Sequence, residues 1–297
     1  MTTPIAVLLP GRGFLAVDGP EARPFLQGLV SNNVDSVSPD RTLYAGLLTA
    51  QGKFLHDFFL AEIAGAVVLD AEAERLPDLT RRLMMYRLRA KATIADRTGD
   101  WVAAAMWDGD WLGLEPKPGA TRAFAGGIVF VDPRLPALGL RAILPRAGAE
   151  AALAAAGFTL AGADAYDRHR LALGVTDGSR DIPVEKAFPL EFGFDDFHAV
   201  SYDKGCYVGQ ELTARTHNRG TIKRRIYPVT IEGPAPAPGT ALHHGESEVG
   251  EMRTSRDGHG IAHLRIDAAE MAIRDGASFT AGPAHVTPHK PVWGDHG

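Results

Sequence analysis

The secondary structure expected from this sequence changes character near Arg225. Before that residue, apolar runs typical of strands alternate with segments that have the 3.6-residue period of helices. After it, helical periodicity returns only near Ala268–Ile273, and short strand-like segments follow one another at even spacing. Evenly spaced short strands separated by turn residues are typical of a barrel. We therefore predict an α+β region over residues 1–222 and a C-terminal β-barrel domain over residues 223–297.

The α+β region is expected to mix helices with hairpin-linked strands, which argues against a purely parallel sheet. The strands expected here are Ile5–Leu9, Phe14–Val17, Thr42–Thr49, Phe54–Ala61, Val67–Asp70, Thr93–Ala95, Trp101–Met106, Ile128–Val131 and Leu140–Leu144. The helices expected are one with Pro20 in its first turn, Leu76–Leu88, Ala149–Ala156, Ala163–Leu173 and Leu212–Asn218. Residues 108–127 are expected to form a loop. The barrel strands expected are Ile226–Ile231, Glu248–Thr254, Gly260–Ile266 and Ser278–Ala281.

The bulk composition excludes several classes of protein. The 297 residues include 45% hydrophobic and 23% charged residues, as in an ordinary soluble protein of about two domains. The net charge of −5 argues against binding nucleic acid through bulk charge. No apolar run reaches the ~20 residues of a transmembrane helix, and the first residues lack the basic region of a signal peptide. Since a single cysteine fits a reducing compartment, we expect a cytoplasmic protein without a membrane partner.

That single cysteine, Cys206, lies in the motif K-G-C-Y-V-G-Q-E at residues 204–211. One cysteine cannot form a disulfide within the chain. Gly205 and Gly209 permit unusual backbone angles and let a partner approach closely. Lys204 and the N-terminus of the helix that follows both favour the thiolate, which is the reactive form. We interpret Cys206 as a functional thiol; the alternative is a small buried hydrophobe, a common state of free cysteine.

At this motif the chain closely resembles the YgfZ family of folate-binding iron–sulfur cluster assembly proteins, relatives of the glycine-cleavage T-protein, an aminomethyltransferase. The family signature K-G-C-[FY]-x-G-Q-E is matched at every position. Further segments resemble the family at residues 25–34, 51–54, 86–91 and 170–174, so that the resemblance covers about residues 5–231. It implies a three-lobed aminomethyltransferase-like cloverleaf. Two α+β lobes, one of them ferredoxin-like, would surround a folate pocket within residues 1–222, and a C-terminal barrel would follow.

The resemblance also implies tetrahydrofolate, or a folate derivative, as the cofactor. A pterin presents neighbouring N–H donors that one carboxylate accepts together, and the folate tail carries carboxylates that suit arginine. Glu191 resembles the pterin-binding glutamate of the T-protein, and Asp70 falls where that protein has a folate-contacting asparagine. Arg12 and Arg170 lie where some family members have a pocket-lining tryptophan. Each residue also has a simpler interpretation. Glu191 could be an acid that faces outward, Asp70 an acid at the end of a strand, and Arg12 and Arg170 solvated arginines.

The segment Phe54–Phe58 resembles the part of the T-protein that holds its catalytic aspartate. Here His56 replaces the first acid of that segment and only Asp57 remains. Because aminomethyl transfer needs a carboxylate to orient and protonate the folate amine, this replacement puts the transferase reaction in doubt. Asp57 still offers one carboxylate, so whether the protein is an enzyme stays open.

A metal site within the chain is not expected. One cysteine cannot hold a cluster that needs four ligands, and His243, His244, His259 and His263 are interpreted as solvated loop residues. The basic segment 223–225 is interpreted as a solvated face, with an RNA contact as the weaker alternative.

We therefore expect a folate-binding protein that uses Cys206, assisted by Lys204, in the assembly or repair of iron–sulfur enzymes, including tRNA-modifying ones. Its partners would be those enzymes or their assembly proteins. The alternatives are a tetrahydrofolate-dependent aminomethyl- or methyltransferase that uses Asp57, and a module that only binds folate.

Overall fold

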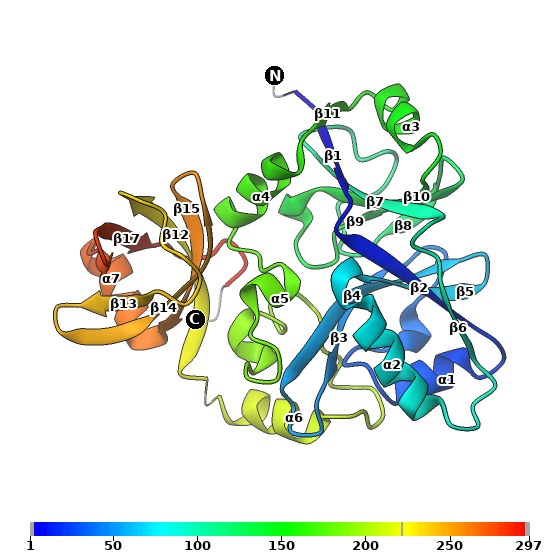
Figure 1. Ribbon diagram of the computed structural model, residues 1–297, viewed down its shortest axis with the longest axis horizontal. Coiled ribbons are helices and arrows are strands. Elements are labelled where there is room, and N and C mark those ends of the chain that lie inside the picture. Colours follow the sequence, from blue (N-terminus) through cyan, green and yellow to red (C-terminus); the bar gives the residue numbers. More distant parts are fainter. Residues whose placement is uncertain (1–2, 221, 295–297) are drawn as a thin grey trace. The chain divides into compact units, whose positions relative to one another are not determined.

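Two units, interleaved along the sequence, make up the chain (Figure 1). The computed structural model describes residues 3–220 and 222–294. Unit 1 comprises residues 1–50, 55–165 and 197–210, and unit 2 comprises residues 51–54, 166–196 and 211–297. The barrel begins near the expected residue 223, but residues 166–196 and 211–222 belong to the same compact unit as the barrel.

Unit 1 contains a five-stranded sheet with the strand order β3-β4-β5-β2-β6. The strands are β2 (Arg12–Asp18), β3 (Leu43–Leu48), β4 (Phe54–Ile63), β5 (Ala66–Glu72) and β6 (Thr93–Asp96). Helices α1 (Ala22–Gln27) and α2 (Leu76–Arg87) accompany it. Leu76, Leu79 and Leu83 form the buried face of α2. A Cβ at Gly13 of β2 would lie 3.0 Å from the Leu76 side chain, so this glycine permits the close packing of α2 on the strand.

A second, six-stranded sheet of unit 1 has the order β11-β1-β7-β10-β9-β8. Its strands are β1 (Ile5–Leu9), β7 (Trp101–Trp107), β8 (Thr121–Phe124), β9 (Gly127–Val131), β10 (Leu140–Pro145) and β11 (Thr159–Ala161). Only the β1–β11 pair is parallel among the pairings described for this sheet. Leu153 of helix α3 (Ala149–Ala155) packs into the same buried cluster as Val129 and Ala142.

Unit 2 contains a closed barrel in which six strands follow the order β12-β15-β14-β13-β16-β17. These are β12 (Arg224–Glu232), β13 (Ala241–His244), β14 (Ser247–Arg256), β15 (His259–Arg265), β16 (Phe279–Ala281) and β17 (Ala284–Pro288). Helix α7 (Ile266–Asp275) adds Ala268, Ala269 and Ala272 to the barrel core. The unit also contains α5 (Gly178–Asp181), the short 3-10 helix η4 (Pro189–Phe192) and most of α4 (Ala163–Ala172) and α6 (Gln210–Arg219).

The expected α+β region followed by a barrel is confirmed, and every expected strand and helix is found within a few residues of its predicted bounds. Helix α1 begins at Ala22 rather than at Pro20. The reason is a turn at Gly19, which has φ 112° and lies so close to Lys91 that a Cβ would come within 2.5 Å of its carbonyl oxygen. The loop expected over residues 108–127 contains β8, and three further short strands, β11, β13 and β17, were not expected.

Among residues 3–220 and 222–294, no helix combines the length and the apolar character that crossing a membrane would require.

Candidate functional site

Cys206 is exposed on a loop of unit 1 formed by residues 198–209, hereafter the thiol loop. It precedes Gln210, the first residue of α6, by four positions. The side-chain oxygen of Gln210 accepts a hydrogen bond from the Tyr207 backbone N–H at 3.1 Å, and the Gln210 backbone N–H donates to the Tyr207 carbonyl at 3.2 Å. These two bonds close a turn immediately after the thiol, as the expected position ahead of a helix requires.

Lys204 is buried and donates to three backbone carbonyls rather than pointing into solvent. Its ammonium group lies 2.8 Å from Gln27 O, 2.6 Å from Val30 O and 2.8 Å from Asn32 O. Burial lowers the pKa of Lys204 to about 8, so the group still carries its proton at neutral pH. The ammonium therefore satisfies three carbonyls of the turn after α1 and anchors the thiol loop to that turn. The role predicted for Lys204 from the sequence was to stabilise the thiolate.

The start of the thiol loop is fixed by two neighbouring polar side chains. Asn32 Nδ2 donates to Tyr44 O at 2.8 Å and to His198 O at 2.7 Å, and Ser31 Oγ donates to Ala199 O at 2.6 Å. His198 itself adopts a left-handed backbone conformation with φ 54°, which a β-carbon disfavours. Such a conformation persists only where the surroundings hold it, and here the bonds from Asn32 and Ser31 do so.

A cavity of about 590 Å³ lies against the thiol loop within unit 1. His198, Ser201 and Asp203 of the loop form one side, and Arg41 and Lys117 contribute positive charge. The loop therefore forms one edge of this hollow, and Cys206 follows Asp203, the last lining residue, by three positions.

Two of the residues predicted to bind folate, Arg12 and Asp70, are brought together by the pairing of β2 with β5. Arg12 Nε donates to Asp70 Oδ1 at 2.6 Å, and Arg141 Nη2 donates to Asp70 Oδ2 at 3.1 Å. The Asp70 side chain is completely buried, and those of Arg12 and Arg141 are 9% and 3% exposed. Both carboxylate oxygens of Asp70 therefore already accept a hydrogen bond from an arginine.

The aromatic ring of Phe59 is surrounded by three guanidinium groups. The guanidinium carbons of Arg12, Arg134 and Arg141 lie 5.7, 5.0 and 4.2 Å from the ring centroid. Arg134 in turn pairs with buried Asp132 at 2.7 Å. The cluster offers positive charge in a low-dielectric interior, where an electrostatic attraction is stronger than in water.

Asp57 is buried, and its Oδ2 accepts a hydrogen bond from the Tyr44 hydroxyl at 2.7 Å. Burial and the negative charge of Asp57 raise the pKa of Tyr44 well above its ordinary value. The neighbouring His56 is also buried and contacts Asp78 Oδ2 at 2.9 Å, with its pKa lowered by burial to about 4. His56 is therefore a neutral structural residue, and Asp57 is a carboxylate held by a phenol.

Glu191 lies in η4 of unit 2, between the buried side chains of Leu190 and Phe192. Its Oε2 is 3.2 Å from His263 Nε2, and the His263 ring stacks on Phe192 with a centroid distance of 4.6 Å. The prediction that His263 is a solvated loop residue is wrong, because this histidine is buried in strand β15. Within the part of the chain that the structure describes, no three His, Cys, Asp or Glu side chains are grouped as metal ligands would be.

Arg170 is fully buried in unit 2 between two carboxylates. Its Nε donates to Asp167 at 2.8 Å and its Nη1 to Asp181 at 2.8 Å, with a further bond from Nη1 to the Val175 carbonyl at 3.1 Å. These contacts are those of a structural ion pair that joins α4 to α5, and not those of an arginine facing a ligand.

The predicted site residues thus fall into separate groups. Cys206 and Lys204 share the thiol loop, Arg12 and Asp70 form one ion pair, and Asp57 belongs to the same unit 1. Glu191 and Arg170 belong to unit 2.

Residues of these networks to which the sequence assigned no role include Asn32, Tyr44 and Arg141. Arg141 carried a usable signal, because an arginine within the apolar run 140–144 either faces solvent or has a buried acidic partner.

Comparison with known protein families gives a match for the barrel and relatives for most of the chain. Residues 223–295 match the family model described as the CAF17 C-terminal β-barrel domain. The chain is 35% identical over 282 residues to the iron–sulfur cluster assembly factor IBA57, mitochondrial, of Homo sapiens, covering 86% of this chain and 76% of that protein. It is 34% identical over 248 residues to the IBA57 homolog, mitochondrial, of Mycosarcoma maydis, covering 79% of this chain but only 59% of that longer protein.

A solved structure gives the fold. The aminomethyltransferase T of the glycine cleavage system from Bartonella henselae aligns with a TM-score of 0.76 over 99% of this chain and 87% of that one, at 16% sequence identity. The expected aminomethyltransferase-like fold with a C-terminal barrel is therefore confirmed. The expected kinship with iron–sulfur cluster assembly proteins is confirmed at the level of the IBA57 relatives.

The predicted cytoplasmic location is contradicted by these relatives, whose names place them in mitochondria. A single unpaired cysteine indicates reducing surroundings, and the cytosol is not the only compartment that provides them.

Proposed function

The chain belongs to the IBA57 family of iron–sulfur cluster assembly factors, and we propose that it supports iron–sulfur cluster assembly through the thiol of Cys206. The observation that carries the proposal is the exposure of this single cysteine on a loop that Lys204 anchors to the Val30 carbonyl. The proposed clients are iron–sulfur enzymes or their assembly proteins, tRNA-modifying enzymes among them.

A single thiol can take part in cluster assembly if other molecules supply the remaining ligands. A cluster needs about four protein ligands, and thiolates are the usual ones. Cys206 offers one ligand, so the cluster would be cargo whose other ligands come from a partner protein or a small thiol. A rigid loop holds the sulfur in place before the partner arrives, which lowers the entropy lost on forming a shared site.

The test compares Cys206→Ser with Asp57→Asn in cells that lack this protein, with the activity of a [4Fe–4S] enzyme as the readout. We expect Cys206→Ser to leave the enzyme inactive and Asp57→Asn to restore it. Full restoration by Cys206→Ser would refute the role of the thiol. Thermal melting of both purified variants separates loss of function from loss of fold.

We further propose that the protein binds tetrahydrofolate, which the aminomethyltransferase-like fold supports. Among the acids considered, Glu191 suits a pterin better than Asp70. The side chain of Glu191 is 25% exposed and pairs with the neutral or charged ring of His263, whereas Asp70 is buried and bound by two arginines. Calorimetric titration with tetrahydrofolate should show saturable binding that Glu191→Gln weakens about tenfold, the loss typical of a charge-assisted hydrogen bond. Absence of any heat of binding would remove folate from the proposal without affecting the thiol.

The alternative function is aminomethyl or methyl transfer to or from folate, with Asp57 as the acid. It is favoured by the hydrogen bond from Tyr44, which holds one oxygen of the Asp57 carboxylate in a fixed direction. This alternative predicts turnover with tetrahydrofolate that Asp57→Asn abolishes and Cys206→Ser leaves intact, the reverse of the pattern expected above.

A further inference from the structure

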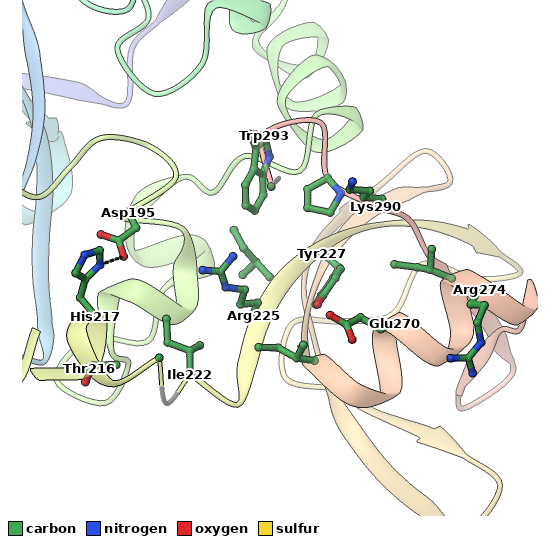
Figure 2. A pocket seen from close by; sticks show the side chains of 16 residues that line it. Asp195, Thr216, His217, Ile222, Arg225, Tyr227, Glu270, Arg274, Lys290 and Trp293 are labelled. Atoms are coloured by element: carbon green, nitrogen blue, oxygen red, sulfur yellow. Dashed lines mark hydrogen bonds and ion pairs between the residues drawn. The ribbon is translucent and has the colours of Figure 1, made fainter. Parts of the chain in front are cut away.

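Unit 2 contains a cavity of about 530 Å³ that includes none of the predicted site residues (Figure 2). Its walls come from the end of α6, the start of β12, the outer face of α7 and the segment 290–294. The volume falls within the range of small-molecule sites, roughly 300–1,000 Å³.

Most of the wall is apolar. Side chains of branched aliphatic and aromatic residues supply it, namely Ile222, Ile226, Tyr227, Ile266, Ile273 and Trp293. Trp293 is held in place, because its indole N–H donates to the Leu173 carbonyl at 2.8 Å. A ring that is already fixed loses little conformational entropy when a second ring stacks on it, and aromatic pairs gain beyond the area they bury.

Two cationic side chains of the lining, Arg225 and Lys290, lie near Trp293. In Figure 2 the Arg225 side chain extends beneath Trp293, and Lys290 lies on the other side of that ring. The Arg225 guanidinium is 3.7 Å from the Asp196 carboxylate, which is beyond direct hydrogen-bond distance, so its donors are only weakly engaged there.

The other charged groups of the lining are placed differently. Asp195 pairs with His217 at 3.0 Å, and Arg274 pairs with Asp275 at 2.8 Å at the outer end of the cavity. Burial raises the pKa of Tyr227 to about 12, and the negative charge of Glu270 next to it adds to this shift. The phenol of Tyr227 is therefore a neutral hydrogen-bond donor at neutral pH.

We propose that this cavity binds a small planar aromatic anion, with its ring against Trp293 and the apolar wall, its carboxylate or phosphate at Arg225, and Lys290 adding positive charge to the lining. Apolar aromatic walls select the ring, and the cations near the fixed tryptophan select a ligand that carries negative charge. The site goes beyond cluster assembly, and neither Cys206 nor Glu191 takes part in it.

The test uses the full chain labelled with 5-fluorotryptophan and followed by fluorine NMR. The four tryptophans give separate signals, and Trp293→Phe identifies the one that belongs to the cavity. We expect 2-naphthoate to shift the Trp293 signal saturably and to leave the other three in place. Naphthyl phosphate in a parallel titration distinguishes a phosphate ligand from a carboxylate ligand. Cyclohexanecarboxylate and 2-naphthalenemethanol, which lack the ring or the charge, should bind at least tenfold more weakly.

Variants of the charged residues give the sharper outcome. Arg225→Gln should weaken 2-naphthoate about tenfold, the loss expected for a hydrogen bond between charged groups, and Glu270→Gln should tighten it severalfold by removing a repulsive charge. Arg168→Gln removes a half-exposed arginine of unit 2 that does not line the cavity, so it is the matched control and should change nothing. If Arg225→Gln lowers the melting temperature of the protein, Lys290→Gln serves in its place, because the Lys290 side chain is exposed. Failure of millimolar 2-naphthoate to move the Trp293 signal, or a shift that none of these charges alters, would overturn the proposal.

Discussion

The ammonium of Lys204 donates to the carbonyl of Val30 at 2.6 Å across a sequence separation of 174 residues. Because the same nitrogen also reaches the carbonyls of Gln27 and Asn32, its three donors are all directed at one turn of the backbone. A tetrahedral ammonium matches three converging acceptors, whereas a planar guanidinium does not. The lysine that precedes the thiol is therefore the anchor of the thiol loop.

Lys204→Met is expected to destabilise the protein by about 2–4 kcal/mol, because it leaves three backbone carbonyls without their donor in a buried position. Lys204→Arg should recover little of this loss. Chemical denaturation measures the free energy of unfolding, and limited proteolysis measures the loosening of residues 198–209.

The control for this prediction is Arg89→Met, which removes a cation from an exposed position. It should change the free energy of unfolding by less than about 0.5 kcal/mol. If Lys204→Met proves equally harmless, or leaves the thiol loop as protease-resistant as in the wild type, the anchoring role is wrong.

Asp70→Asn is expected to cost about 3–5 kcal/mol, since Arg12 and Arg141 would keep their charges in the interior without the compensating carboxylate. Differential scanning calorimetry measures the change. Asp100→Asn breaks an ion pair with Arg97 in which both side chains are about half exposed, and it should cost at most about 1 kcal/mol. Equal effects of the two substitutions would mean that the buried pair contributes no more than a surface one.

The elements of this fold could be predicted where a hydrophobic period fills them, as in β4, β7 and α2. Strand β8 could not, because its four residues lie at the edge of a sheet and two of them are exposed, so no alternation marks it. The position of Cys206 on the surface followed from its glycine-rich, polar neighbours. The sequence did not reveal which acid each arginine meets, because residue type sets the charge whereas strand register and long-range pairing select the partner. Arg12 meets Asp70 through the β2–β5 register.

Asp181→Asn should weaken the connection between α5 and the barrel. One oxygen of the Asp181 carboxylate accepts from Arg170 at 2.8 Å, and the other accepts from the Thr254 backbone N–H at 2.9 Å. An amide turns one of these acceptors into a donor that faces another donor, so we expect a loss of about 2–4 kcal/mol. Asp177→Asn, at a more exposed position, is the control and should cost under about 1 kcal/mol. Hydrogen exchange at the Thr254 amide reports the local effect, and unchanged protection there would contradict the prediction.

The buried imidazole of His56 should make stability fall as the solution is acidified from about pH 6.5 to 4. Its pKa is about 4 in the folded protein, chiefly because of burial, against 6.5 in the unfolded chain. Between these values the unfolded chain binds a proton that the folded protein does not, so the free energy of unfolding decreases with falling pH, by at most about 2–3 kcal/mol.

Asp78, which contacts His56, does not titrate between pH 4 and 6.5. Burial raises the pKa of Asp78, but hydrogen bonds from Arg82, His56 and Arg81 outweigh it and hold that pKa below the usual 3.8, so the carboxylate titrates at lower pH. His56→Gln can still donate to Asp78 and has no titrating ring. Urea denaturation at intervals between pH 4 and 7 should therefore show a smaller slope for His56→Gln than for the wild type. Identical slopes would show that another group carries the pH dependence, and a wild type that gains stability on acidification would contradict a neutral buried His56.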